Sequence, residues 1–261
     1  MFLDDNFFEL TIVSLIGLLL GSFATVLYWR IPRKRSWFLS TSDRMFSRSK
    51  CLHCGHQLAA YDLFPVISWV IRGGKCGYCK EEIGFSHLLI EILTLAACLG
   101  IYSVHGLTII SAILILMVPF LVALIFIDID HMILPNQLIL ILLALTIGYT
   151  FLPYILGQVT WDNSADLYNN LLGMVLFPLI IIVCSRFMSF FLKKETLGLG
   201  DVKFFSVCGL LLGFTHLPIF LIFSGAIGVA IGLFYNKILC QQIYPFGPAL
   251  IIAFYAGMLF T

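Results

Sequence analysis

The stretch Gly198-Leu199-Gly200-Asp201-Val202-Lys203 places an ionisable carboxylate directly after two glycines, at the start of an apolar run. A charge in or near a lipid bilayer is costly unless it has a partner or water, so an acid there predicts function. A second acid, Asp128, ends another apolar run far back in the chain. We interpret most of the remaining sequence as a scaffold that brings Asp128 and Asp201 together at one membrane face.

The composition is that of an integral membrane protein. Hydrophobic residues make up 61% of the 261 positions, charged residues make up 11%, and the mean hydropathy is +1.03. A soluble domain has about 45–50% apolar and about 25% charged residues. The apolar runs have helix length and do not alternate with polar residues, which excludes an outer-membrane barrel. The start carries no Lys or Arg, so we expect the first run to remain as a membrane helix.

About eight apolar runs predict about eight transmembrane helices, because roughly 20 residues are needed to cross a bilayer. The runs lie near Leu10–Trp29, His87–Val104, Thr108–Ile127, Gln137–Leu156, Leu171–Ser185, Val202–Phe214, Pro218–Phe234 and Tyr244–Phe260. The predicted fold class is therefore an all-α polytopic membrane protein. Its expected parts are a first membrane helix at 1–29, a polar loop at 30–86 and a helical core at 87–261.

The charges support this topology. In the predicted arrangement, the loops on one side hold all 15 Lys and Arg residues of the chain. The opposite side holds only acidic residues, namely Asp4, Asp5, Glu9, Asp162 and Asp166. Because positively charged loops stay in the cytoplasm, we expect both termini to be periplasmic. The long loop, Asp128 and Asp201 then all lie at the cytoplasmic face.

Two carboxylates that share a site cannot both ionise easily, so one of them keeps its proton. The ionised member can activate water and the protonated member can donate to a carbonyl oxygen, which suffices to hydrolyse a peptide bond. Gly198 and Gly200 permit close approach of another backbone, such as a substrate strand. The alternative is structural: Asp201 caps its helix and Asp128 merely ends another.

Asp130 competes with Asp128 for this role. Two residues apart on a helix, the two side chains point in nearly opposite directions, so only one can face Asp201. Asp128 borders the apolar run and is expected to be the desolvated one, whereas Asp130 and His131 are expected in a polar turn. Pro135 and Asn136 are expected to begin the next helix.

Four cysteines form two Cys-x-x-Cys pairs in the long loop, at Cys51, Cys54, Cys76 and Cys79. Their spacing is close to that of a four-cysteine zinc site, in which four thiolates bind Zn²⁺ tetrahedrally. Structural disulfides are rare in the cytoplasm, so this location favours structural zinc over two disulfides. A membrane thiol oxidoreductase that uses these pairs is a further alternative.

The same loop contains an amphipathic aromatic stretch from Tyr61 to Trp69, and basic residues that suit anionic headgroups. We therefore expect the loop to contact membrane lipid, and we do not expect nucleic acid as a partner. Glu91 begins the second predicted span, where we expect it to pair with a loop arginine or to contact a basic substrate.

With these elements in order, the chain resembles the bacterial type IV prepilin peptidases, which belong to the GxGD-type intramembrane aspartyl proteases. The resemblance is carried by Gly21-Ser22-Phe23, the cysteine pairs around Gly73-Gly74-Lys75, Asp128 with Leu134-Pro135, Gly198-Leu199-Gly200-Asp201, and Pro245-Phe246-Gly247-Pro248. It extends over nearly the whole chain.

The resemblance implies an enzyme of the bacterial inner membrane that cleaves short basic leaders from prepilins and pseudopilins at the cytoplasmic face. It assigns catalysis to Asp128 and Asp201. It also implies methylation of the new N-terminal residue from S-adenosylmethionine, associated with the cysteine loop, with Gly74 as a candidate residue of that site. The alternatives are a peptidase without methyltransferase activity, and a transporter that uses its paired acids for ion coupling.

Overall fold

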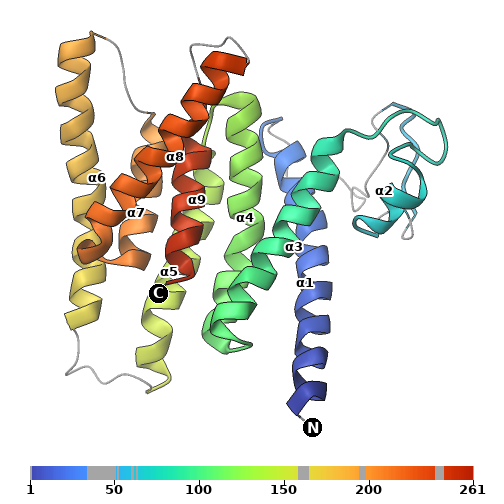
Figure 1. The fold of residues 1–261 in the computed structure, drawn as a ribbon, viewed down its shortest axis with the longest axis horizontal. Helices are drawn as coiled ribbons and strands as arrows, with labels where there is room; N and C mark the ends of the chain where they lie inside the picture. Colours follow the sequence, from blue (N-terminus) through green and yellow to red (C-terminus); the bar gives the residue numbers. More distant parts are fainter. Residues whose placement is uncertain are drawn as a thin grey trace, which may run out of the picture. The chain divides into compact units, whose positions relative to one another are not determined.

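The computed structural model describes residues 2–33, 51, 53–59, 62, 64–157, 165–193, 198–238 and 244–260. The predicted basic residues Lys34, Arg35, Arg44, Arg48, Lys50 and Lys194, together with Asp162, Tyr61 and Leu63, lie outside these ranges. The described chain is nearly all helical, as predicted (Figure 1). Its helices are α1 (Phe2–Arg30), α2 (Ile67–Ile71), α3 (Phe85–His105), α4 (Ile109–His131), α5 (Asn136–Ile155), α6 (Ala165–Leu192), α7 (Leu199–Leu212), η3 (Phe214–His216), α8 (Leu217–Ile238) and α9 (Gly247–Met258).

The number of full-length spans differs from the prediction. Among the described residues, six helices are long and apolar enough to cross a membrane, namely α1, α3, α4, α5, α6 and α8. Helices α7 and α9 have 14 and 12 residues. At about 1.5 Å per residue they extend about 21 and 18 Å, less than the ~30 Å hydrocarbon core of a bilayer. Helix α7 ends at its C-cap, Gly213, because this glycine has a φ of 74° that other residues rarely adopt.

Helix α4 is longer than its apolar run. It continues to His131 and ends at Met132, whose left-handed backbone donates its N–H to Asp128 O at 2.9 Å. The prediction that Asp130 and His131 lie in a polar turn is therefore wrong, since both belong to the last helical turn. The prediction that Pro135 and Asn136 begin the next helix is confirmed, because Pro135 is the N-cap of α5.

The chain divides into two compact units, which are described separately. The first comprises Met1–Ser103 with Val118–Ala123, and the second comprises Val104–Met117 with Leu124–Thr261. In the first unit, α1 and α3 cross at a glycine, because a Cβ on Gly21 would lie 2.9 Å from Glu91 Cα. The Tyr102 hydroxyl also donates to Glu9 Oε2 at 3.1 Å. Small residues at such crossings let the two helix backbones approach closely.

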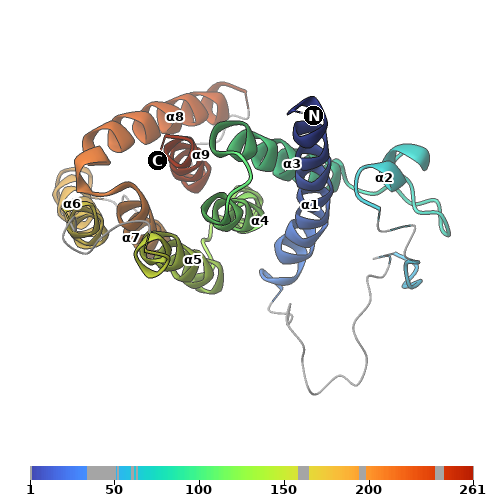
Figure 2. The ribbon, with the colours of Figure 1, turned by 90° about the horizontal axis from the view of Figure 1, so that it is seen from below.

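The second unit is built around α7, which packs against α5, α6 and α9. The backbones of α6 and α7 touch, because a Cβ on Gly173 would lie 2.3 Å from Gly209 O. Beyond the end of α7, Thr215 N–H donates to Asn169 Oδ1 near the start of α6. Figure 2 shows α9 between α8 and α4 in this unit. Helix α7 therefore runs antiparallel to α6 but covers only about half of its length.

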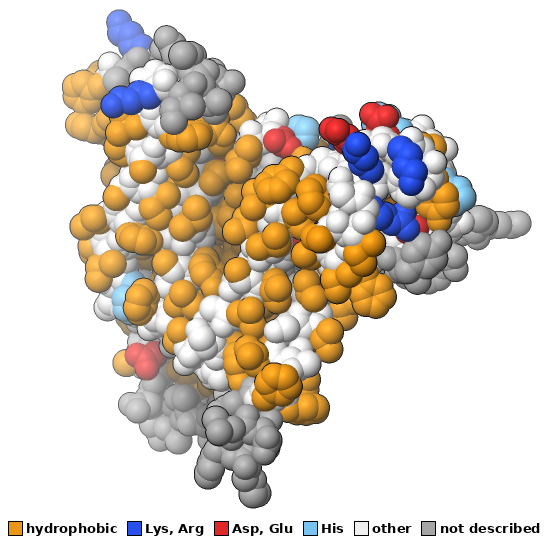
Figure 3. Space-filling model, turned by 45° about the vertical axis from the view of Figure 1, so that its right-hand side comes forward, with side chains coloured by type: hydrophobic (Ala, Val, Ile, Leu, Met, Phe, Trp, Pro, Cys, Tyr) orange, Lys and Arg blue, Asp and Glu red, His pale blue; other side chains and the backbone are white. Residues whose placement is uncertain are grey.

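Hydrophobic side chains cover most of the helical surface visible in Figure 3. Charged side chains gather at the ends of helices and on the cysteine loop. This distribution is the one expected where lipid surrounds the middle of the helices and water surrounds their ends.

Candidate active site and candidate metal centre

Asp128 lies in the last turn of α4 and is only 6% exposed. Its Oδ2 accepts the backbone N–H of Gly247, the first residue of α9, at 2.9 Å. A Cβ on Gly247 would lie 2.6 Å from the same oxygen, so no residue with a side chain fits there without moving the carboxylate. The first N–H groups of a helix have no partner inside the helix and carry partial positive charge, which favours an anion at this position.

Asp201 lies in the first turn of α7. A Cβ on Gly198, the N-cap, would lie 3.2 Å from Asp201 Oδ2, and a Cβ on Gly200 would lie 2.9 Å from Leu134 Cβ. The absence of a side chain at Gly200 lets the start of α7 lie against the segment that follows α4, and its absence at Gly198 leaves room for the Asp201 carboxylate. Lys203 Nζ donates to Asn136 Oδ1 at 2.8 Å and fastens α7 to the start of α5.

These contacts bring Asp128 and Asp201 together, and the negative charge of Asp128 acts on the carboxylate of Asp201. Asp130 and His131, by contrast, are exposed to the surroundings. Within this pair one carboxylate therefore gains from staying neutral while the other is charged. Such an arrangement can supply a proton acceptor and a proton donor to one reacting group.

Sequence reasoning missed the role of Gly247. In the sequence, Gly247 stands out only as part of Pro245-Phe246-Gly247-Pro248, which indicates no role for it. A Gly-Pro pair at a helix start is compatible with many ordinary helices, because proline fits the first helical turn without losing a hydrogen bond. The pattern alone could not indicate which side chain the Gly247 N–H would meet.

The four loop cysteines form one cluster in the structure. Their Sγ atoms all lie within 4.8 Å of one another, and Cys51 Sγ and Cys79 Sγ are 3.7 Å apart. Four thiolates at about 2.3 Å from a tetrahedral Zn²⁺ lie about 3.8 Å from one another. The cluster therefore has the size of a four-thiolate metal site and could hold a metal ion.

Each cysteine pair sits in the same type of turn. Gly55 N–H donates to Cys51 O at 3.0 Å, and Lys80 N–H donates to Cys76 O at 3.0 Å. Both donors have positive φ, 67° for Gly55 and 61° for Lys80. Backbone hydrogen bonds from Cys79 and Tyr78 lower the pKa of the Cys76 thiol from 9.0 to about 6. The fold thus stabilises at least one thiolate, the form that binds metal.

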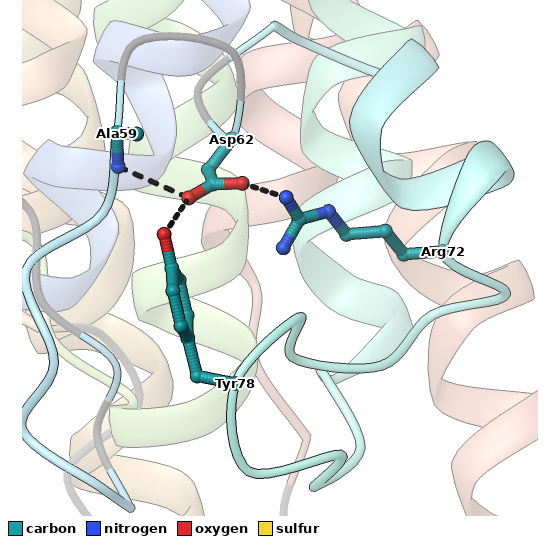
Figure 4. Close-up of polar contacts among 4 residues, drawn as sticks. All are labelled: Ala59, Asp62, Arg72 and Tyr78. Carbon is teal, nitrogen blue, oxygen red and sulfur yellow. Dashed lines mark hydrogen bonds and ion pairs between the residues drawn. The ribbon is translucent and has the colours of Figure 1, made fainter.

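An ion pair supports the same loop from within (Figure 4). Asp62 pairs with the Arg72 guanidinium, and its other carboxylate oxygen accepts from Ala59 N–H at 3.0 Å and Tyr78 hydroxyl at 3.3 Å. Arg72 also covers Gly77, whose Cβ, if present, would collide with the guanidinium. These contacts join the stretches before and after α2 around the cysteine cluster.

Gly74 in the loop and Glu91 in α3 have structural partners. Gly74 has a φ of 70°, and a Cβ there would lie 2.7 Å from Trp69 Cζ2. Glu91 Oε2 accepts the backbone N–H of Val66 in the loop at 2.7 Å, and the expected pairing of Glu91 with a loop arginine or a basic substrate stays a prediction. Val66 itself has a φ of 61°, a strained value for a β-branched residue.

The fold and the site together define a helical membrane protein with two electrostatically coupled carboxylates and a four-cysteine cluster. Residues 15–105 match the Bacterial Peptidase A24 N-terminal domain, and residues 114–233 match the Type IV leader peptidase family. The chain therefore belongs to the type IV leader peptidase family and is a peptidase.

Curated relatives carry one shared name, prepilin leader peptidase/N-methyltransferase. The protein from Aeromonas hydrophila is 30% identical, over 95% of this chain and 90% of its own. The protein from Vibrio cholerae is 28% identical over 94% of both chains, and that from Pseudomonas aeruginosa is 29% identical over 94% and 88%. No solved structure matches the chain significantly.

Proposed function

We propose that this peptidase removes the short basic leader from type IV prepilins and pseudopilins, with Asp128 and Asp201 as its catalytic pair. The name shared by its relatives supports the substrate class. The observation that carries the catalytic assignment is the buried Asp128 carboxylate, fixed by Gly247 N–H and acting on Asp201. The resemblance to the family assigns catalysis to the same two acids.

The proposed mechanism assigns a different state to each acid. Asp128, which accepts a hydrogen bond from the start of α9, is the ionised member and removes a proton from water. The water oxygen attacks the carbonyl carbon of the scissile peptide, while Asp201 gives its proton to the carbonyl oxygen. Collapse of the tetrahedral intermediate breaks the C–N bond: the leaving nitrogen takes the proton that Asp128 removed from water, and the intermediate's hydroxyl returns its proton to Asp201 as the carbonyl re-forms.

A direct assay tests this proposal. Purified protein in liposomes should convert a prepilin to a shorter product, and sequencing the product should place the new N-terminus after the leader. Asp128→Asn and Asp201→Asn should each abolish conversion while the protein remains inserted. Undiminished conversion by either variant would reject the assignment of that acid.

The second proposed activity is methylation of the new N-terminal residue from S-adenosylmethionine. The relatives' shared name supports it, and Gly74 remains our candidate residue for that site. The ring of Trp69 lies against Gly74 and leaves no room for a side chain at that position. Transfer of a labelled methyl group to processed pilin would test this activity separately from cleavage.

We propose that the cysteine cluster binds structural Zn²⁺ through Cys51, Cys54, Cys76 and Cys79. When bound, the ion ties the two turns of the loop together and takes no part in hydrolysis, because all four positions around it are protein ligands. The exposed side chains of Phe64 and Ile67 in the same loop suit contact with membrane lipid.

We further propose an eight-span topology in the bacterial inner membrane, in which α7 and α9 are short crossing helices. If α7 did not cross the membrane, α8 would run in the opposite direction. Lys237 would then lie on the other side of the membrane from the remaining basic residues. In this topology both termini are periplasmic, and Asp128 and Asp201 face the cytoplasm. Labelling single cysteines introduced next to each helix end would test the orientation.

A further inference from the structure

A groove of about 560 Å³ runs along one side of the candidate site, between α4, α8 and α9. Nearly every group that lines it is apolar. The lining residues are Ile125, Ile129, Ile227, Ala230, Ile231, Phe234, Tyr235, Pro245, Pro248 and Ile252. Phe234 and Ile252 are exposed in its walls.

The walls of the groove are held in place by packing, because the segment before α9 packs on α8. Gly228 lies under the ring of Phe246, and Gly232 lies under the ring of Tyr244. A Cβ on either glycine would come within 3.0 Å of the ring above it. These ring-on-glycine contacts set the position of the start of α9 relative to α8.

The groove is continuous with the catalytic pair. Its wall residues Ile125 and Ile129 belong to α4, and Asp128 lies about 60° around that helix from Ile125. Its wall residue Pro248 directly follows Gly247, the residue whose N–H binds Asp128. A chain whose peptide bond reaches Asp128 therefore meets the groove within its next few residues.

We propose that this groove holds the apolar helix of the protein substrate that follows the cleavage site, an inference that rests on the proposed function. A basic leader stays on the side of the membrane that carries the lysines and arginines, so the chain after the cut enters the bilayer. There it must be helical to satisfy its backbone hydrogen bonds, and its side chains must be apolar. Between Ile227 and Tyr235, α8 rises about 12 Å, enough for two turns of such a helix.

Binding in the groove holds the substrate helix in a fixed position. It gives no hydrophobic driving force, since the surrounding lipid is as apolar as the groove. Its role is to hold the scissile peptide at the carboxylates. Loss of the groove should therefore weaken the use of full-length substrates more than that of short ones.

Two neighbouring residues of α8 provide a matched test in reconstituted full-length enzyme. Ala230 lines the groove, whereas Val229 is 62% exposed and lies outside it. Ala230→Trp should raise KM for a full-length prepilin roughly tenfold, and Val229→Trp should not. The penalty of Ala230→Trp should be much smaller on a peptide with the same leader and cut site but a polar tail.

Photo-crosslinking gives a second measurement. The photoreactive analogue p-benzoylphenylalanine in place of Phe234, in an Asp201→Asn background, should capture the apolar segment of the prepilin. The same analogue in place of Phe223, which is also exposed but does not line the groove, should not.

Several results would overturn the inference. Equal KM values for the two tryptophan variants, or crosslinks from position 234 to lipid alone, would reject the groove while leaving cleavage intact and the proposed function standing. A wild-type enzyme that cleaves neither the full-length prepilin nor the short peptide would reject the proposed function, and this inference with it.

Discussion

Gly247 and Asp128 are 119 positions apart in the chain, yet the Gly247 N–H donates to Asp128 Oδ2 at 2.9 Å. The contact joins the start of α9 to the last turn of α4. It also leaves no room for a side chain at position 247. The buried carboxylate thus depends on a glycine that carries no chemistry of its own.

Gly247→Ala should therefore impair catalysis more than folding. The added Cβ would lie 2.6 Å from Asp128 Oδ2 and must displace the carboxylate. Misplacement by about 1 Å can cost about 100-fold in rate, so we expect at least that loss in kcat with a smaller change in KM. Gly225→Ala is the control, because a Cβ at that position meets nothing within 4 Å. Normal turnover by Gly247→Ala would show that the contact does not position Asp128.

The glycine crossing of α6 and α7 should determine stability. A Cβ on Gly209 would lie 2.1 Å from Gly173 O, and one on Gly173 would lie 2.3 Å from Gly209 O. Because both obstacles are backbone atoms, the helices must separate, and we expect Gly209→Ala to cost at least about 2 kcal/mol. Thermal unfolding in detergent would measure the loss. Gly148→Ala on α5, where a Cβ meets no neighbour, should leave the unfolding temperature unchanged or slightly higher.

The cysteine cluster should hold one metal ion per chain and lose it on acidification. Folding lowers the pKa of the Cys76 thiol from 9.0 to about 6, through backbone hydrogen bonds from Cys79 and Tyr78. In the same cluster the pKa of the Cys79 thiol is raised to about 12, so Cys76 is the thiol that ionises more readily of the two. Because zinc must displace the protons of all four thiols, its affinity falls with the pH, and zinc should be retained at pH 8 and released below about pH 6.

Metal analysis after dialysis at each pH would check this prediction. Cys76→Ser should lower the zinc content, whereas Cys184→Ser, at an exposed cysteine on α6, should not. Stoichiometric zinc in Cys76→Ser would show that the ion is bound elsewhere.

How far the sequence predicted the structure depended on whether a feature is local. The helices follow from apolar runs of sufficient length, and the cysteine cluster follows from two Cys-x-x-Cys pairs, each in a turn closed by a local backbone hydrogen bond. The ends of α7 were placed less well. The helix starts at Leu199, before the apolar run, because Gly198 serves as its N-cap and Asp201 fits its first turn.

The candidate site was only partly visible in the sequence for a physical reason. Burying a charged residue in a membrane protein costs free energy, so an acid within an apolar stretch indicates a functional role. Asp128 and Asp201 could be identified from the sequence for this reason. The contact between Asp128 and Gly247 leaves no such signal, because a backbone N–H is present at nearly every position. Its partner is decided by how α4 and α9 pack, and hydropathy alone does not specify this.

Asp62 provides a test that separates the loop from the catalytic pair. The Asp62 carboxylate organises the loop. It pairs with Arg72 and accepts hydrogen bonds from the Ala59 N–H and the Tyr78 hydroxyl. Asp62→Ala leaves the half-buried guanidinium without this partner and removes the bond to Tyr78, which neighbours the cluster. Amide hydrogen exchange over residues 53–80 should therefore accelerate at least about tenfold, and zinc should dissociate faster.

The same variant should keep leader cleavage, because Asp128 and Asp201 belong to the other compact unit. Methyl transfer, which the proposed function associates with the loop, should fall. Glu81→Gln is the matched control, since Glu81 contributes its backbone carbonyl to Cys76 N–H while its side chain is exposed. If Asp62→Ala abolished cleavage as completely as Asp201→Asn, the loop would have to support the peptidase reaction directly, and the separation of the two activities would fail.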